Sequence, residues 1–119
     1  MKHIPISQPS ITSKQIDYVT DAISSGWVSS PGKYIDPFED KFASYCGTKY
    51  SVATGNGTIA LHLALVSLGI SAELQVIIPD LTFVATGNAV KHVGAKVVTM
   101  DIEPDTLCIN PQAIKNLLH

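Results

Sequence analysis

The chain has 119 residues, of which 45 % are hydrophobic, and a mean hydropathy of +0.23. This length fits one small domain or part of a larger one, and the composition excludes a disordered segment. Eight lysines, no arginine and ten acidic residues give a net charge of −2 without a basic stripe, so nucleic acid is not an expected partner.

The sequence predicts a cytoplasmic protein that has no contact with a membrane. No apolar run reaches the length of a membrane span, and the first residues lack the apolar segment of a signal peptide. Cys46 and Cys108 lie far apart without a CxxC motif, which is typical of free thiols in a reducing compartment. Neither cysteine is an expected metal ligand, and no metal site is predicted.

The first part of the chain predicts an extended arm, a helix and a loop. Residues 4–11 contain two prolines, and a capping box at Thr12 and Gln15 then predicts a helix over residues 13–25. The following loop holds the only tryptophan, Trp27, close to Ser29. An exposed aromatic residue there is typical of a binding surface, but a tryptophan that only packs the loop down is at least as good an interpretation.

The remaining elements predict an α/β fold. The segment 36–39 has a hydrogen-bond acceptor at Asp36, a proline at the next position and an acid at Glu39, which together predict the start of a second helix that should end at Gly47. After it we expect strands and helices in the order β-α-β-α-β, followed by a last helix after Asn110-Pro111. The expected strands are residues 50–54, 76–78 and 95–100, and the helices between them are 58–68 and 84–93. Right-handed crossovers place these strands in one mostly parallel sheet flanked by helices.

The turn at residues 55–58 is a candidate phosphate site. Its two glycines allow a sharp turn and the close approach of a ligand, and Asn56 can cap a helix whose first N–H groups stay free. Such a helix start binds anions, and the Thr58 hydroxyl adds a donor that suits a phosphate. An ordinary βα turn, whose glycines serve only the backbone, explains the turn alone equally well.

A second candidate loop, residues 80–83, leaves the next predicted strand at the same end. Ligands of parallel sheets bind beyond the carboxyl ends of the strands. Phosphate donors on one loop and the Phe83 ring on the other could hold a flat phosphorylated cofactor. On the pattern alone, Phe83 is equally well explained as a core residue.

Five segments of the chain occur in the order of a known family: residues 26–30, 47–50, 56–65, 79–86 and 101–106. Together they resemble the N-terminal part of the DegT/DnrJ/EryC1/StrS family of pyridoxal-phosphate-dependent nucleotide-sugar aminotransferases, from about residue 4 to the end of the chain. Residues 27–35 further resemble the perosamine synthase branch, which aminates a 4-keto-6-deoxy sugar carried on GDP.

The resemblance implies part of the large domain of the aspartate aminotransferase type (fold type I), in a homodimer with its active site at the dimer interface. It implies that Gly57 and Thr58, with Asn56 at the same turn, bind the phosphate of pyridoxal 5′-phosphate and that Phe83 stacks on the pyridine ring. Trp27 and Ser29 would lie near a nucleotide-sugar substrate, with glutamate as the usual amino donor. Residues 1–36 would form the arm, helix and substrate-side loop, and residues 37–119 the incomplete cofactor-binding domain.

No residue of the chain is assigned a catalytic role. The family's Schiff-base lysine and the aspartate that pairs with the pyridine nitrogen match segments beyond residue 119, and the lysines present are expected to be solvated surface residues. We therefore expect a fragment that is inactive alone. We also expect uncovered apolar faces that make it poorly soluble or dependent on a partner chain.

Three alternative interpretations assign the chain a different ligand, a different reaction or a non-catalytic role. Residues 55–60 fit the GxGxxA fingerprint of an NAD(P)-binding Rossmann-type domain, with Asp80 about twenty residues on, although that fingerprint normally opens a domain. The chain could instead be a non-catalytic remnant that serves as an interaction module. It could also be related to pyridoxal-phosphate-dependent sugar dehydratases, in which a histidine replaces the lysine.

Overall fold

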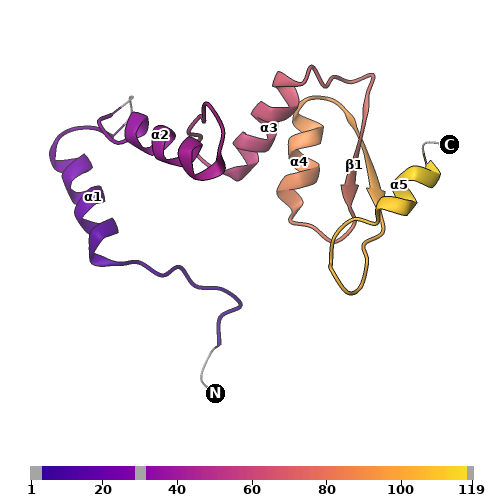
Figure 1. The fold of residues 1–119 in the computed structure, drawn as a ribbon, viewed down its shortest axis with the longest axis horizontal. Coiled ribbons are helices and arrows are strands. Elements are labelled where there is room, and N and C mark those ends of the chain that lie inside the picture. The colour runs from indigo at the N-terminus through magenta and orange to yellow at the C-terminus, as the bar shows by residue number, and fades with distance from the viewer. Residues whose placement is uncertain (1–3, 29–31, 118–119) are drawn as a thin grey trace. The chain divides into compact units, whose positions relative to one another are not determined.

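A computed structural model describes residues 4–28 and 32–117 of the chain (Figure 1). The chain divides into two compact units, residues 1–53 and residues 54–119. The first unit holds helices α1 (Ser13–Ser24) and α2 (Ile35–Cys46). The second holds α3 (Gly57–Ser67), β1 (Gln75–Pro79), α4 (Val84–His92), β2 (Lys96–Met100) and α5 (Pro111–Leu117). Among the described residues, no helix is long and apolar enough to cross a membrane. The predicted domain boundary after residue 36 stays a prediction.

The helices of the first unit begin and end at local signals. The Gln15 side chain accepts a hydrogen bond from the Thr12 N–H at 2.6 Å, which confirms the predicted cap of α1. Gly47, with a φ of 68°, ends α2 in the left-handed conformation that glycine adopts readily. The predicted start of α2 at Asp36 is wrong by two residues, because Tyr34 is already in a helical conformation and its carbonyl accepts the Phe38 N–H at 3.1 Å.

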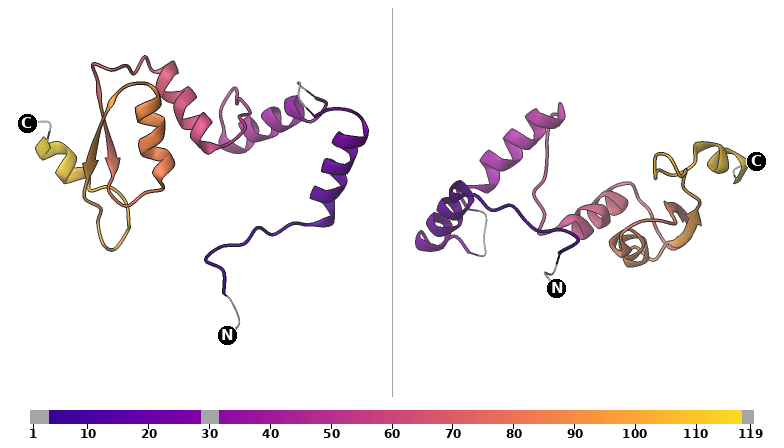
Figure 2. Two further views of the ribbon diagram at one scale, coloured as in Figure 1. Left: turned by 180° about the vertical axis from the view of Figure 1, so that it is seen from behind. Right: turned by 90° about the horizontal axis from the view of Figure 1, so that it is seen from below.

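The second unit is a βαβ arrangement with a small core. β1 and β2 pair in parallel, from Gln75 opposite Lys96 to Pro79 opposite Met100. α4 connects the two strands and packs against both of them (Figure 2). Its residue Val90 forms a core with Ile78 of β1 and Ala95, against which further apolar residues pack: Leu65, Ile70, Val76, Val93 and Val97.

The predicted strand at residues 50–54 is wrong. The described residues of this segment contain no strand, because neither β1 nor β2 lies beside them as a hydrogen-bonded neighbour. Their polar groups turn instead to Glu39 of α2, whose carboxylate accepts the Ala53 N–H at 2.7 Å and whose carbonyl accepts the Ser51 hydroxyl at 2.6 Å. The central order in the structure is therefore α-β-α-β, with a two-stranded sheet.

α3 is mostly apolar, with only Thr58, His62 and Ser67 carrying polar side chains, yet none of its residues is buried. Leu61 and Leu63 keep 43 % and 45 % of their surface exposed. Helices of this composition are normally enclosed on all sides. Apolar faces are therefore uncovered within the described part of the chain, whereas the predicted low solubility stays a prediction.

Candidate functional site

The start of α3 is built by Asn56. Its backbone is extended (φ −169°, ψ 171°), and its side-chain oxygen accepts the Ile59 N–H at 3.0 Å. Its carbonyl accepts the Ala60 N–H at 3.1 Å and the Thr54 hydroxyl at 3.1 Å. These bonds confirm that Asn56 caps the helix, as its type and position predict.

The cap leaves three donors free. Asn56 takes up the N–H groups of Ile59 and Ala60, but those of Gly57 and Thr58 and the Thr58 hydroxyl have no hydrogen-bond partner among the described residues. Unpaired N–H groups carry the positive end of the helix dipole. Three donors at one helix start fit an anion with several acceptor oxygens, and a phosphate is such an anion.

Of the two roles predicted for the glycines of this turn, the sharp turn is wrong, and the close approach of a ligand stays a prediction. Neither Gly55 nor Gly57 is among the described residues with a positive φ, so a sharp glycine-dependent turn is not what they provide. A Cβ placed on Gly57 would meet no atom within 4 Å. Neither the local conformation nor a neighbouring group therefore requires glycine at position 57, and its open side leaves room for a ligand to reach the backbone.

Phe83 stands at the start of α4. It is the N-cap residue of that helix, and 78 % of its surface is exposed. The interpretation of Phe83 as a core residue does not hold within this unit. A large ring exposed beside a helix start is instead available to a ligand.

The two candidate loops lie at the same end of the second unit. α3 and α4 pack against each other, and the rings of His62 and His92 meet edge to face at a centroid distance of 5.7 Å. Figures 1 and 2 show that both helices begin toward the end at which β1 and β2 finish. The free donors of α3 and the ring of Phe83 therefore share the end at which parallel α/β folds bind ligands.

The predicted substrate residues belong to the first unit. Trp27 is 47 % exposed, and its backbone N–H donates a hydrogen bond to the Ala22 carbonyl at 3.0 Å. It lies against Gly32, where an added Cβ would come within 3.0 Å of the Trp27 Cβ. Trp27 thus lies against Gly32 while almost half of its surface stays exposed, and its contact with substrate stays a prediction. Ser29 lies outside the described residues.

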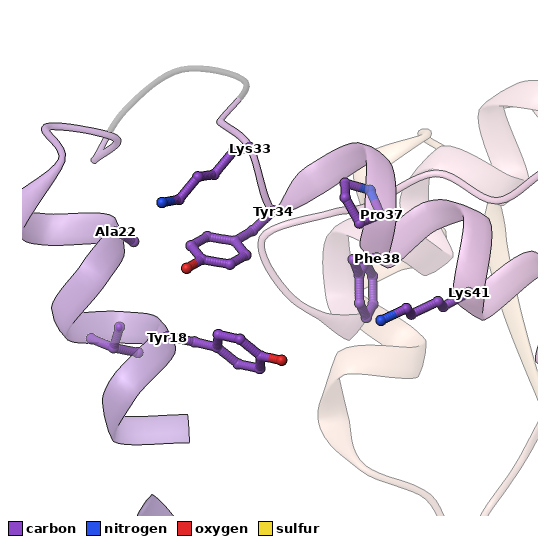
Figure 3. A pocket seen from close by; sticks show the side chains of 8 residues that line it. Tyr18, Ala22, Lys33, Tyr34, Pro37, Phe38 and Lys41 are labelled. Atoms are coloured by element: carbon purple, nitrogen blue, oxygen red, sulfur yellow. The ribbon is translucent and has the colours of Figure 1, made fainter. Parts of the chain in front are cut away.

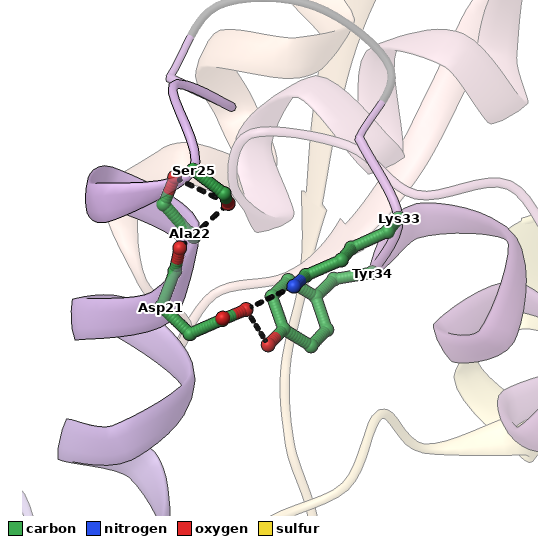
Figure 4. A network of polar contacts seen from close by, with 5 residues as sticks. All are labelled: Asp21, Ala22, Ser25, Lys33 and Tyr34. Atoms are coloured by element: carbon green, nitrogen blue, oxygen red, sulfur yellow. Dashed lines mark hydrogen bonds and ion pairs between the residues drawn. The ribbon is translucent and has the colours of Figure 1, made fainter.

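An ionic cluster in the first unit was not predicted (Figure 4). Asp21 of α1 accepts hydrogen bonds from the Lys33 ammonium at 2.5 Å and from the Tyr34 hydroxyl. The Lys33 and Tyr34 hydrogen bonds, in that order, lower the pKa of Asp21, and the Asp21 carboxylate raises the pKa of both partners. Lys33 is therefore paired, not simply solvated. No sequence signal identifies this pair, because its partners lie twelve positions apart across a loop.

Comparison of the sequence with known proteins identifies a family to which the chain is similar. A model of the DegT/DnrJ/EryC1/StrS aminotransferase family matches residues 9–119. The chain is 47 % identical to GDP-perosamine synthase of Escherichia coli O157:H7 over 106 residues, which make up 89 % of this chain and 29 % of that protein.

Solved structures agree with this match. The aminotransferase from Psychrobacter cryohalolentis superposes with a TM-score of 0.81 and 36 % identity, over 94 % of this chain and 29 % of that one. NtdA from Bacillus subtilis with bound cofactor PMP superposes with a TM-score of 0.78 and 31 % identity, over 89 % of this chain and 25 % of that one. The chain thus spans less than a third of each of these relatives.

These matches confirm the predicted fold class, an α/β portion of a fold type I enzyme with a parallel sheet flanked by helices. They do not support the NAD(P)-binding domain, the non-catalytic remnant or the sugar dehydratase. The dinucleotide fingerprint also requires a strand directly before its glycines, and the described residues before Gly55 form none.

Proposed function

Because the chain belongs to the DegT/DnrJ/EryC1/StrS aminotransferase family, we propose that it is the part of a nucleotide-sugar aminotransferase that holds pyridoxal 5′-phosphate. The start of α3 carries this proposal, with its three free donors and the open side of Gly57. These donors would bind the cofactor phosphate, and the exposed ring of Phe83 would stack on the pyridine ring.

The chain's contribution to the reaction is to anchor and orient the cofactor. Bound pyridoxal phosphate supplies the electron sink that transamination needs. The α3 helix start would offset the phosphate charge, and the Thr58 hydroxyl would add one hydrogen bond to a phosphate oxygen. Phe83 would keep water from one face of the ring and restrict its rotation, which holds the reacting group in a fixed orientation.

Two lysines of the second unit do not lie at this end. Lys91 is in the last turn of α4, about 10 Å along the helix from its first residue at a rise of 1.5 Å per residue. Lys96 is the first residue of β2, at the opposite end of the strand from the candidate loops. Lys115 is an exposed residue of the short helix α5 and matches no Schiff-base motif. We therefore propose that the 119 residues bind the cofactor but do not transaminate alone.

The substrate proposal is a nucleotide-linked 4-keto-6-deoxy sugar, with an amino acid such as glutamate as donor. The 47 % identity to a GDP-perosamine synthase supports it. A second relative, with 42 % identity over 108 residues, is a spore coat polysaccharide biosynthesis protein of Bacillus subtilis, and we propose a role in polysaccharide biosynthesis in the cytoplasm. The complete enzyme is proposed to be a homodimer.

The experiment compares the binding of pyridoxamine 5′-phosphate with that of pyridoxamine. Neither compound can form an imine with surface lysines, so the difference between them reports the phosphate site. We expect the phosphorylated compound to bind more tightly. Thr58→Val, which keeps the β-branched shape and removes the hydroxyl, should weaken its binding about tenfold or more, since a hydrogen bond to a charged group contributes about 1.5–3 kcal/mol.

Thr99→Val is the matched control. Thr99 is an exposed residue of β2, and its hydroxyl has no hydrogen-bond partner among the described residues, so its replacement should leave the dissociation constant unchanged. Equal binding of the two compounds, or equal effects of the two valine variants, would refute the phosphate site. Formation of an amino sugar from pyridoxal phosphate, glutamate and a nucleotide-linked 4-keto sugar would refute the proposed inactivity.

A further inference from the structure

Asp21 binds the residues that lead into α2 back to α1, on the far side of Trp27 in the chain. The Trp27 backbone N–H donates to the Ala22 carbonyl of α1 at 3.0 Å, which fixes the chain just after α1. The Asp21 carboxylate accepts hydrogen bonds from the Lys33 ammonium at 2.5 Å and from the Tyr34 hydroxyl (Figure 4). The last turns of α1 therefore hold the chain both at Trp27 and at the start of α2.

The Trp27 side chain rests on Gly32, the residue directly before Lys33. A Cβ added to Gly32 would lie 3.0 Å from the Trp27 Cβ and 3.2 Å from its Cγ, a closer approach than a side chain at position 32 would allow. Gly32 is not among the described residues with a positive φ, so the close approach, not the backbone conformation, requires glycine here. Because Gly32 and Lys33 are neighbours, a bond that fixes Lys33 also fixes the surface on which Trp27 lies.

Packing offers little else to hold this surface in place. No residue of α1 is buried, and Ala43 is the one buried residue of α2, so the described parts of the two helices share no buried core. Figure 3 shows the Lys33 and Tyr34 side chains reaching from the start of α2 toward α1. Exposed ion pairs add little to overall stability, but hydrogen bonds to a charged group are short and directional. The contacts of Asp21 are therefore better suited to fixing a position than to stabilising the fold.

We propose that Asp21 is a positioning residue for Trp27. By binding Lys33 and Tyr34, it holds Gly32 against the Trp27 side chain and so fixes the orientation in which that ring is presented to a substrate. The proposal rests on the function proposed above, because Trp27 is the predicted substrate residue. Asp21 itself contacts neither the substrate nor the cofactor in this role.

The test is collisional quenching of Trp27 fluorescence by acrylamide in the 119-residue chain without any ligand. Trp27 is the only tryptophan, so excitation that avoids the tyrosines reports on this residue alone. Asp21→Asn keeps the size of the side chain and removes its charge, and it should raise the quenching constant. Because 47 % of Trp27 is already exposed, the rise should reach at most about twofold. Lys33→Gln should have the same effect, and the double variant should show no larger effect than either change alone.

Asp17→Asn is the matched control. Asp17 is an exposed residue one turn earlier on α1 and makes no salt bridge among the described residues, so its replacement should leave the quenching constant unchanged. Far-ultraviolet circular dichroism checks that the helices persist, and Lys33→Gln, which lies outside both helices, decides the question if Asp21→Asn loses helical structure. Equal effects of the Asp17 and Asp21 variants, or additive effects of the Asp21 and Lys33 variants, would overturn the proposal.

A titration of Asp21→Asn with pyridoxamine 5′-phosphate distinguishes failure of this proposal from failure of the proposed function. An unchanged quenching constant in a chain that binds the compound overturns the positioning role alone. A raised quenching constant in a chain that does not bind it, with the parent chain equally unable to bind, overturns the cofactor site alone.

Discussion

Gly57→Ala separates a cofactor role for Gly57 from a structural one. Position 57 does not have a positive φ, and a Cβ there would meet no atom within 4 Å. Alanine loses less conformational entropy on folding, so the variant should be more stable than the parent chain by about 0.4–1 kcal/mol. If a phosphate approaches the backbone at this point, the new methyl group occupies ligand space. The cost of such overpacking is about 1–3 kcal/mol, or roughly a 5- to 150-fold increase in the dissociation constant.

The assay measures both quantities on the same samples. Urea unfolding followed by circular dichroism gives the stability, and titration with pyridoxamine 5′-phosphate gives the affinity. Gly87→Ala in α4 is the control, because its Cβ would make an ordinary contact of 3.7 Å with Ile78 of the core, and it should leave the affinity unchanged. The reasoning is refuted if Gly57→Ala binds the compound as tightly as Gly87→Ala, or if it lowers stability in the absence of ligand.

Two further predictions concern hydrogen bonds seen in the structure. Asn56→Ala removes the hydrogen bond from the Ile59 N–H and should lower the free energy of unfolding by about 1 kcal/mol. Asn88→Ala, on the exposed side of α4, is the control and should leave the free energy of unfolding unchanged or raise it. Equal effects of the two variants in urea unfolding would contradict the capping role of Asn56. The lowered pKa of Asp21 means that its contact with Lys33 stabilises the first unit above the ordinary pKa of 3.8 and loses this effect as the pH falls through the lower folded value. An NMR titration of the Asp21 carboxyl group should show this lowered pKa in the parent chain and a rise toward the ordinary value in Lys33→Ala, where the Tyr34 hydrogen bond remains; an unchanged pKa in that variant would contradict the pairing.

Sequence patterns predicted the elements whose signals are local. Thr12 with Gln15, Gly47, and Asn56 with Ile59 each act over a few residues, and the structure has a helix start or end at each of them. The same holds for β1 and β2, which are short apolar runs between turn residues. At the helix ends the hydrogen bonds form between near neighbours in sequence, so residue type and spacing suffice to predict them. β1 and β2 pair across the α4 crossover, with Gln75 opposite Lys96, and only their apolar composition was local.

Sequence patterns gave wrong or missing predictions where the hydrogen-bond partner of a residue lies elsewhere in the chain. Residues 50–54 have the composition of a strand, but a strand needs a neighbour, and Glu39 takes the Ala53 N–H instead. The pairing of Asp21 with Lys33 depends on how the loop between them folds, which no periodicity indicates. The sharp turn predicted from the glycines at 55 and 57 is wrong, because neither has a positive φ, whereas the open space at Gly57 is compatible with the close approach of a ligand that the same pattern predicted.

The two parts of the candidate cofactor site differ in what holds them in place. The donors at the start of α3 are fixed by bonds from Asn56 to Thr54, Ile59 and Ala60, all within four residues of it. Phe83 is placed by α4, which rests on the core of Ile78, Val90 and Ala95. We therefore expect the proposed phosphate contact to depend on this short stretch and the proposed ring contact to depend on the packed βαβ unit. The prediction for a chain that spans less than a third of its relatives is that both contacts form, because the first depends on local sequence and the second on a core that lies within residues 54–119.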